Sequence, residues 1–355
     1  MKTARDYEAC LLGGGIGDAL GGAIEFYSLD TIRSEHGPEG VQGFVDWVHY
    51  GMQAKACFTD DTQMTLFTAD GLIRAWRHAQ TVGDTRWYRR LTHQAYLRWF
   101  RTQELREDWK EEKRDDGWLF GHRELHRRMA PGSTCMSALA SGRRGGVENE
   151  GRLNESKGCG TVMRLAPAGL LCGSPLMDAW DLGCDLGAIT HGHETGIQSG
   201  GAFAVIVDAL AKGVPLKEAI VRSLLRVTDA ATAAAIEAAC RVAAEHPATA
   251  ESVELLGEGW IAEEALSIAL FCALKHPADF RKAVLLAVNH SGDCDSTGAI
   301  CGNLMGLLVG LDGIPAEWRS GIDLGDVLSR VGQDLHALRT GLDIPGDLEE
   351  RYPLV

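Results

Sequence analysis

The sequence GAICGNLMGLLVG (residues 298–310) has a glycine at every fourth position. A second stretch, GGGIGDALG (residues 13–21), contains the same spacing. Residues four apart lie on one face of a helix, and a glycine inside a helix costs about 1 kcal/mol relative to alanine. Such a row therefore indicates a face that another backbone approaches closely. We predict two tightly packed central helices, with the rows Gly13, Gly17, Gly21 and Gly298, Gly302, Gly306, Gly310.

Apolar residues recur at helical spacing through much of the remaining chain. Strand patterns are scarce: Val41–Val45 is the best candidate, and strand–helix alternation is missing. We predict an all-α fold with little or no sheet, formed as one domain over residues 1–355. A charged segment at about 101–130 is either a solvated helix face or a lid over a cleft. The expected helices are residues 62–76, 198–210, 216–227, 230–244, 262–274 and 279–288.

The composition is that of a folded, soluble protein, with 45% hydrophobic and 24% charged residues. A formal charge of -14 disfavours nucleic acid and anionic lipid as partners. The N-terminus carries charges where a signal peptide needs an apolar run, and residues 300–311 are too few and too glycine-rich to cross a bilayer. We expect a cytoplasmic protein. The ten cysteines form no C-x-x-C pair, so nearly all are expected to be small buried hydrophobes.

Two acidic motifs stand where helices begin. Asp60 and Asp61 precede a long amphipathic helix, and Asp60 with Gln63 fits a helix cap. A second carboxylate with flanking threonines exceeds what a cap requires, so metal binding is an equal alternative. Asp293 and Asp295 open the glycine-striped helix. An EF-hand is excluded there because the twelfth position from Asp293 is a leucine, which leaves a capped helix or an acidic site.

Together these motifs supply the oxygen ligands that Mg²⁺ or Mn²⁺ prefers. If they converge, they could hold two ions about 3.5 to 4 Å apart and activate a water. Glu25 shares a helical face with Gly17 and Gly21, whereas Asp18 is expected to be a structural acid. Neither a GxGxxG fingerprint nor a P-loop is present.

Five motifs occur in the order seen in ADP-ribosylglycohydrolases, which the chain resembles from about Tyr7 to Trp318. They are GDALG (17–21) with Glu25, TDDT (59–62), GTVMR (160–164), Thr190-His191 and GDCDSTG (292–298). The resemblance implies an all-α orthogonal helical bundle with a binuclear Mg²⁺ or Mn²⁺ centre. Members of the family hydrolyse the glycosidic bond between ADP-ribose and a protein side chain, commonly arginine or serine. The positions that match the family's metal ligands are Thr59, Asp60, Asp61, Asp293, Asp295 and Ser296.

The resemblance also implies roles in catalysis. Our hypothesis is that the ions hold the ribose hydroxyls while Glu25, or a metal-bound carboxylate such as Asp60 or Asp295, orients a water toward the anomeric carbon. Negatively charged ligands would favour the positive charge of the transition state. Nothing in the sequence spacing shows that these residues meet.

Several other residues are weaker candidates for binding the substrate. By resemblance His191 lines the ADP-ribose site, although a structural histidine is equally expected, and a zinc pair with His193 lacks a third ligand. Trp260 could stack on adenine or anchor a helix. The motif Gly132, Ser133, Thr134, Cys135 could present backbone N–H groups to a diphosphate or could simply cap a helix.

The sequence departs from the dinitrogenase-reductase-activating type at two places. Ala130 replaces an aspartate, and Cys159 replaces an asparagine. The leading hypothesis is a hydrolase of ADP-ribosylated proteins, with arginine the first choice of linkage and serine or another oxygen linkage the second. The alternatives are a hydrolase of small ADP-ribose conjugates and a catalytically silent ADP-ribose-binding or structural protein.

Overall fold

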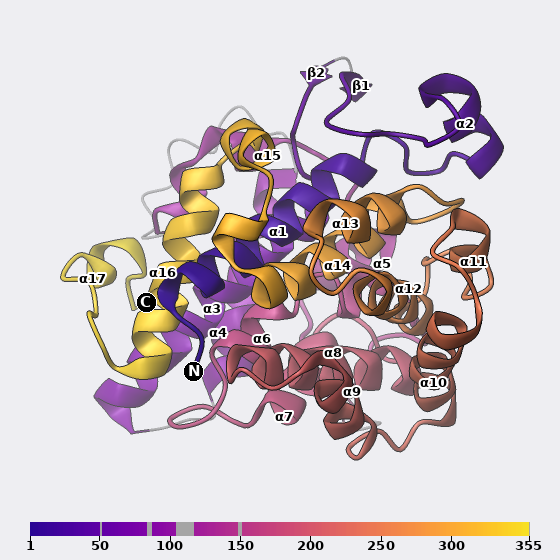
Figure 1. Cartoon of the computed structure of the whole chain (residues 1–355). Coiled ribbons are helices and arrows are strands. Elements are labelled where there is room, and N and C mark those ends of the chain that lie inside the picture. The colour runs from indigo at the N-terminus through magenta and orange to yellow at the C-terminus, as the bar shows by residue number, and fades with distance from the viewer. Residues whose placement is uncertain (50–51, 84–86, 104–116, 148–150, 355) are drawn as a thin grey trace.

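The computed structural model describes residues 1–49, 52–83, 87–103, 117–147 and 151–354. Within these ranges the chain is helical apart from one short hairpin, and Figure 1 shows α1 and α14 at the centre of the molecule. The helices are α1 (Ala4–Gly21), α2 (Leu29–His36), α3 (Asp60–Val82), α4 (Tyr88–Gln103), α5 (Ser133–Ala140), α6 (Ala166–Leu170), α7 (Ala179–Gly187), α8 (Glu194–Ala211), α9 (Leu216–Leu224), α10 (Ala230–Glu245), α11 (Ala250–Glu254), α12 (Ala262–Lys275), α13 (Phe280–Val288), α14 (Cys294–Val309), α15 (Ala316–Gly321), α16 (Gly325–Thr340) and α17 (Leu348–Arg351).

The predicted pair of central helices is confirmed. Helices α1 and α14 run antiparallel, so that Gly13 faces Gly302 and Gly17 faces Gly298. A Cβ atom added to Gly302 would lie 2.5 Å from the carbonyl carbon of Gly13 and closer still to its oxygen. The glycines therefore bring two backbones closer than any other residue permits. Both helices are buried around almost their whole circumference, as a central helix must be.

The last glycine of the row has a different role. Gly310 has a φ of +71° and is the C-cap of α14, where its N–H donates to the Gly306 carbonyl. A left-handed C-cap suits glycine because it carries no Cβ. Gly310 therefore ends the helix, and it lies against the Asp6 side chain of α1 and not against an α1 carbonyl group.

The all-α prediction is confirmed, and each helix expected from periodicity is present. The proposed strand Val41–Val45 is wrong. The backbone of Val41 donates to and accepts from the side-chain amide of Asn289, at 2.8 and 3.0 Å, so its hydrogen bonds are made without a neighbouring strand. The observed hairpin follows it, as β1 (Trp47–His49) paired antiparallel with β2 (Met52–Ala54).

The charged segment at 101–130 is only partly described, because residues 104–116 lie outside the described ranges. Its end forms two short 3₁₀ turns, Leu119–Gly121 and Arg123–His126. All ten cysteines are free, and eight are buried. Among the described residues, no helix is both long enough and apolar enough to cross a bilayer.

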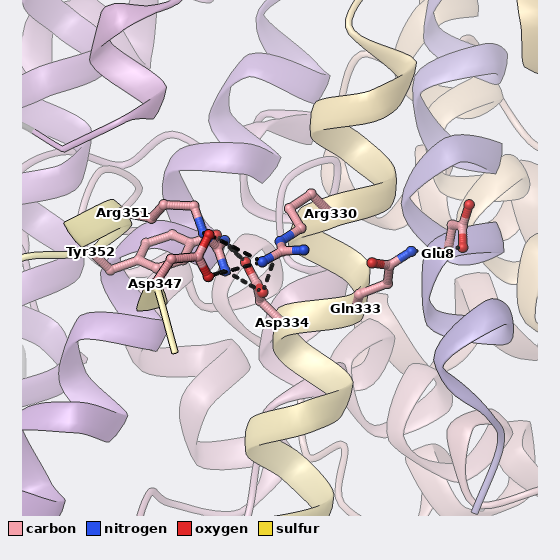
Figure 2. Close-up of polar contacts among 7 residues, drawn as sticks. All are labelled: Glu8, Arg330, Gln333, Asp334, Asp347, Arg351 and Tyr352. Carbon is pink, nitrogen blue, oxygen red and sulfur yellow. Dashed lines mark hydrogen bonds and ion pairs between the residues drawn. The ribbon is translucent and has the colours of Figure 1, made fainter. Parts of the chain in front are cut away.

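A buried ionic cluster fastens the C-terminal segment to α16 (Figure 2). The Asp334 carboxylate is fully buried and accepts two hydrogen bonds from the Arg351 guanidinium and one from the Tyr352 hydroxyl. Asp347 bonds the same guanidinium and that of Arg330. Four donor–acceptor links thus meet at Arg351, whose pKa is raised by these two carboxylates. Removing one partner of such a buried ion pair destabilises the folded protein, because the other charge stays buried without its partner.

Substituting Gly302 tests the helix crossing. We expect Gly302→Ala to lower the free energy of unfolding by about 3 kcal/mol, because the new methyl group overlaps the Gly13 carbonyl and pushes α1 from α14. Denaturant unfolding followed by circular dichroism measures this loss. The matched control is Gly121→Ala, where no atom lies within 4 Å of the new Cβ, and equal midpoints for the two variants would contradict the packing argument.

Substituting Asp334 tests the C-terminal cluster. Asp334→Ala removes the buried partner of Arg351 and leaves only the half-exposed Asp347 to pair with its charge, so we expect a loss of about 3 kcal/mol in the free energy of unfolding. The control is Glu218→Ala, which breaks an exposed pair with Arg222 and should cost about 0.5 kcal/mol. A loss at Asp334 no larger than that of the control would show that the cluster contributes nothing to stability.

Candidate active site

The helix crossing places two acidic segments together. Since α1 and α14 are antiparallel, the end of α1 meets the start of α14, and Gly21 packs on the carbonyl group of Cys294. Asp293 caps α14 by accepting from the Ser296 N–H at 3.3 Å, and the same N–H donates to Asp295 at 3.0 Å. The acids of α14 therefore lie beside Glu25, which follows α1.

Asp18 attaches the start of α3 to the same place. Its carboxylate accepts from the Thr59 N–H at 2.7 Å, the Thr62 N–H at 2.9 Å and the Thr62 hydroxyl at 2.6 Å. Asp18 is thus a structural acid, as expected, and it caps α3 from another helix. Thr59 is the N-cap residue of α3, so the interpretation of Asp60 with Gln63 as a cap is wrong. Gln63 instead accepts hydrogen bonds from α4, and both aspartates at the start of α3 are left for another role.

The acids at the helix starts and Glu25 line one pocket of about 340 Å³. The predicted residues that it brings together are Glu25, Asp60, Asp61, Gly132, Ser133, Thr134, Cys135, His191, Trp260, Asp293, Asp295 and Ser296. Thr59 lies behind this surface, fully buried, and accepts a long hydrogen bond of 3.5 Å from the Asp61 N–H. The site residues deduced from the sequence therefore converge on this pocket, except Thr59, which does not line it.

The acids of this pocket repel one another. Burial, followed by the charges of Asp295 and Asp293, raises the pKa of Glu25 to about 11. Burial and the charge of Asp295 raise the pKa of Asp18 to about 7. Burial is likewise the first cause that raises the pKa values of Asp60, Asp61 and Asp293 well above the usual range of a carboxyl group.

The donor set fits a hard divalent cation. Asp61 is almost fully buried, and its Oδ2 has no hydrogen-bond partner. Such an atom is costly unless a ligand satisfies it, and carboxylate and hydroxyl oxygens are the ligands that Mg²⁺ and Mn²⁺ prefer. Within the described ranges, no three His, Cys, Asp or Glu side chains yet converge on one point as metal ligands do. The chemistry of the donors thus supports a cation, and their placement defines no single metal position.

His191 lines the same pocket as the acids and does not form a zinc pair with His193. His191 is buried and lines the pocket, whereas the Nδ1 of His193 accepts from the Thr195 N–H at 3.2 Å and caps α8. The two histidines therefore serve different purposes. No zinc cluster is formed by the described part of the chain.

An aromatic pair forms part of the pocket, and one member was missed from the sequence. Trp260 neither stands alone nor is fully buried: its ring stacks on Phe26, with ring centroids 5.2 Å apart and an angle of 19° between the planes. Phe26 is 70% exposed and has a φ of +71°, an unusual backbone conformation for a residue with a side chain. The signal that could have revealed Phe26 is its position directly after Glu25, at the end of the glycine-striped helix.

The backbone N–H of Gly132 already makes a hydrogen bond within the protein. Its N–H donates to the Asp60 carboxylate at 3.1 Å, so this amide is not free for a diphosphate. Cys159, one of the two departures noted above, accepts a hydrogen bond from the Ser296 hydroxyl at 3.4 Å and adds a thiol to the acidic wall. Ala130, the other departure, lines the pocket with a φ of +49°.

Comparison with known proteins identifies the family. A family model described as ADP-ribosylglycohydrolase matches residues 2–344. The chain belongs to the ADP-ribosylglycohydrolase family. The solved structure titled "ADP-ribosylglycohydrolase-related protein complex" matches it with a TM-score of 0.66 and 24% identity, covering 96% of this chain and 100% of the other, and so supports the fold of this family member.

Three curated relatives of this family member span most of its length. "ADP-ribosylarginine hydrolase Tri1" of Pseudomonas putida is 25% identical over 92% of the chain and 77% of the relative. An uncharacterized protein of Archaeoglobus fulgidus is 27% identical over 94% of the chain and 96% of the relative. "ADP-ribosyl-[dinitrogen reductase] glycohydrolase" of Rhodospirillum rubrum is 23% identical over 88% of each chain.

The raised pKa values predict how stability changes with pH. A carboxyl group whose pKa is higher in the folded than in the unfolded state binds protons more tightly when folded, so its stabilising effect is complete at low pH and is lost as the pH rises through the folded value. For Asp18 this window runs from about 4 to about 7, and for Glu25 it extends further upward. In EDTA, the melting temperature should therefore fall between pH 5 and pH 8.

Differential scanning fluorimetry measures this trend, and Asp61→Asn is the informative variant. Removing one charge of the cluster should flatten the dependence on pH. A melting temperature that rises from pH 5 to pH 8 in EDTA, or an unchanged slope in the variant, would show that the acids do not repel one another in the folded protein.

Proposed function

We propose that this protein hydrolyses the glycosidic bond between ADP-ribose and a protein side chain, in a reaction that depends on divalent cations. The observation that supports the proposal most directly is that acids from two distant helix starts, together with Glu25, line one pocket in a member of the ADP-ribosylglycohydrolase family. The described residues that line this pocket include no lysine or arginine that could pair with its buried carboxylates. A cation would relieve the repulsion between them.

Two Mg²⁺ or Mn²⁺ ions would be held by Asp60, Asp61, Asp293, Asp295 and Ser296, with Thr59 behind them. When bound, such ions polarise the oxygens of a substrate and of a water. Asp61 contributes the most direct support for this assignment, because its unpartnered Oδ2 requires a ligand. The hydrogen bonds of Asp18 to Thr59 and Thr62 keep the start of α3 in place while the acids bind.

The protein's own side chains would then act on the glycosidic bond. Glu25 would orient a water toward the anomeric carbon, with Asp60 and Asp295 as further candidates for this task. The negative charge of the acidic wall favours the oxocarbenium character of the transition state. The stacked rings of Phe26 and Trp260 cover part of the pocket and would limit access of bulk water.

Arginine is the proposed linkage. Two relatives are named for ADP-ribosylarginine and for ADP-ribosylated dinitrogen reductase, respectively. Serine or another oxygen linkage is the second choice, because Ala130 and Cys159 change the surroundings of the pocket relative to the dinitrogenase-reductase type. The protein partner is an ADP-ribosylated protein, and ADP-ribose is the product.

Asp293→Asn tests the metal-dependent mechanism. The substitution removes one charge from the acidic wall, and we expect turnover to fall by at least about 100-fold, which corresponds to about 2.7 kcal/mol, together with a clear loss of Mn²⁺ affinity. Isothermal titration with Mn²⁺ and an assay of released ADP-ribose measure the two effects. Asp312→Asn is the control, since that side chain is largely exposed and lies outside the pocket. Full activity of Asp293→Asn would end the proposal.

The same assay decides the linkage. Peptides carrying ADP-ribose on arginine or on serine are compared with and without Mg²⁺ or Mn²⁺, and we expect cation-dependent release from the arginine peptide. Release from the serine peptide alone would show that the enzyme acts on the serine linkage and not on the arginine linkage. Binding of ADP-ribose without release from either peptide would identify a silent binding protein.

A further inference from the structure

Sulfur-containing side chains line the pocket together with the acids. They belong to Cys135, Cys159 and Met163. Carboxylate and hydroxyl oxygens are the ligands that suit Mg²⁺, whereas thiolate sulfur favours softer transition cations such as Zn²⁺. A sulfur atom that shares the site of a cation therefore changes which cation binds best.

The Cys159 sulfur and the Ser296 hydroxyl have the spacing of two ligands on one cation. The Sγ and Oγ atoms lie 3.4 Å apart, and the Met163 sulfur is further from the same oxygen, at 3.9 Å. Bonds of about 2.1 Å to oxygen and about 2.3 Å to sulfur place adjacent ligand atoms about 3.1 to 3.6 Å apart around a metal ion. The distance between Cys159 and Ser296 falls inside this range, so one ion can bind both atoms without moving either.

Backbone hydrogen bonds hold both residues in place. Cys159 begins a 3₁₀ turn, and its N–H donates to the Trp260 carbonyl at 3.1 Å. Ser296 lies in the first turn of α14, where its N–H donates to the two acids that open the helix. Each side chain reaches its sulfur or oxygen atom through a single rotatable bond, so a cation that binds both atoms orders little that is still free.

An independent observation also points to a ligand at this part of the pocket. Asp61 is 2% exposed and lines the pocket, and its Oδ2 makes no hydrogen bond with the described residues. Burial, followed by the charges of Asp293 and Asp61, raises the pKa of the Cys159 thiol, so both acids lie near the sulfur. The thiol is hydrogen-bonded to Asp293. Sulfur, hydroxyl and carboxylate atoms therefore meet around one part of the pocket.

We infer that Cys159 is a ligand of one of the proposed cations, adjacent to Ser296, and that its sulfur makes this centre prefer a transition cation such as Zn²⁺ over Mg²⁺. This inference rests on the proposed function for the presence of the cations. On binding, the cation replaces the proton of the thiol, and that proton passes to solvent. The asparagine of the dinitrogenase-reductase type carries no sulfur, so the preference belongs to chains with a cysteine at this position.

Absorption spectroscopy with Co²⁺ tests the sulfur ligand in the absence of substrate. A thiolate bound to Co²⁺ gives a charge-transfer band in the near-ultraviolet difference spectrum, and we expect this band when the wild-type protein is titrated with Co²⁺. Cys159→Ser should bind Co²⁺ without the band. The matched control is Cys240→Ser, which should keep the band, because Cys240 is the other cysteine that is not buried and it does not line the pocket. Binding of Co²⁺ to the wild-type protein without the band, or a band that persists in Cys159→Ser, would overturn the inference.

Isothermal titration with Zn²⁺ and with Mg²⁺ tests the preference. Cys159→Ser and Cys159→Asn both replace the sulfur, and we expect the ratio of Zn²⁺ affinity to Mg²⁺ affinity to fall by at least about tenfold in each, since even a residue that only supports a metal ligand contributes that factor. Cys240→Ser should leave the ratio unchanged, and circular dichroism shows whether the variants fold. A wild-type ratio retained in the folded Cys159 variants would show that the sulfur does not select the cation, and would overturn the preference.

These measurements separate the inference from the proposed function. Release of ADP-ribose by a protein whose Co²⁺ complex lacks the band would overturn the sulfur ligand and leave the proposed function standing. The band without release from either peptide would support the sulfur ligand and end the proposed function. Failure of the wild-type protein to bind any of these cations would end both.

Discussion

The close contact between α1 and α14 is the constraint on which the rest of the structure depends. It requires glycine on both helices, because each row packs directly on the carbonyl groups of the other. The antiparallel arrangement then determines which residues meet at the end of the crossing: Glu25 after α1, and Asp293 and Asp295 at the start of α14. The packing of these two helices thus places three of the acids that line the pocket.

Asp18 extends this arrangement to a third helix. By capping α3 from within α1, it releases Asp60 and Asp61 from that task and leaves their carboxylates in the pocket. The result is a concentration of buried negative charge, which destabilises the folded protein unless protons or cations accompany it. A structure that tolerates this arrangement must be stabilised elsewhere, and the large apolar core together with the cluster at Asp334 and Arg351 provides that stability.

Much of the architecture could be predicted because its signals are local. The glycine rows and the acids at helix starts are patterns within a few residues of one another. The errors arose where a distant side chain competes for a backbone or side-chain group: Asn289 binds the backbone of Val41, and residues of α4 bind Gln63. Phe26 was missed because its position after Glu25 was not weighed, and its stacking on Trp260 joins two segments that are distant in the sequence.

The interlocked backbones of α1 and α14 also limit how the pocket can move. Neither helix can slide or rotate against the other without driving glycine carbonyls into neighbouring atoms, so Asp18 in α1 and Asp293 and Asp295 at the start of α14 keep fixed relative positions. A change in the shape of the pocket must then come from its remaining walls. These are the turn that carries Trp260, the segment before α5, and the His191 turn. If a ligand binds as proposed, these segments can adjust to it while the acids at the helix crossing stay in place.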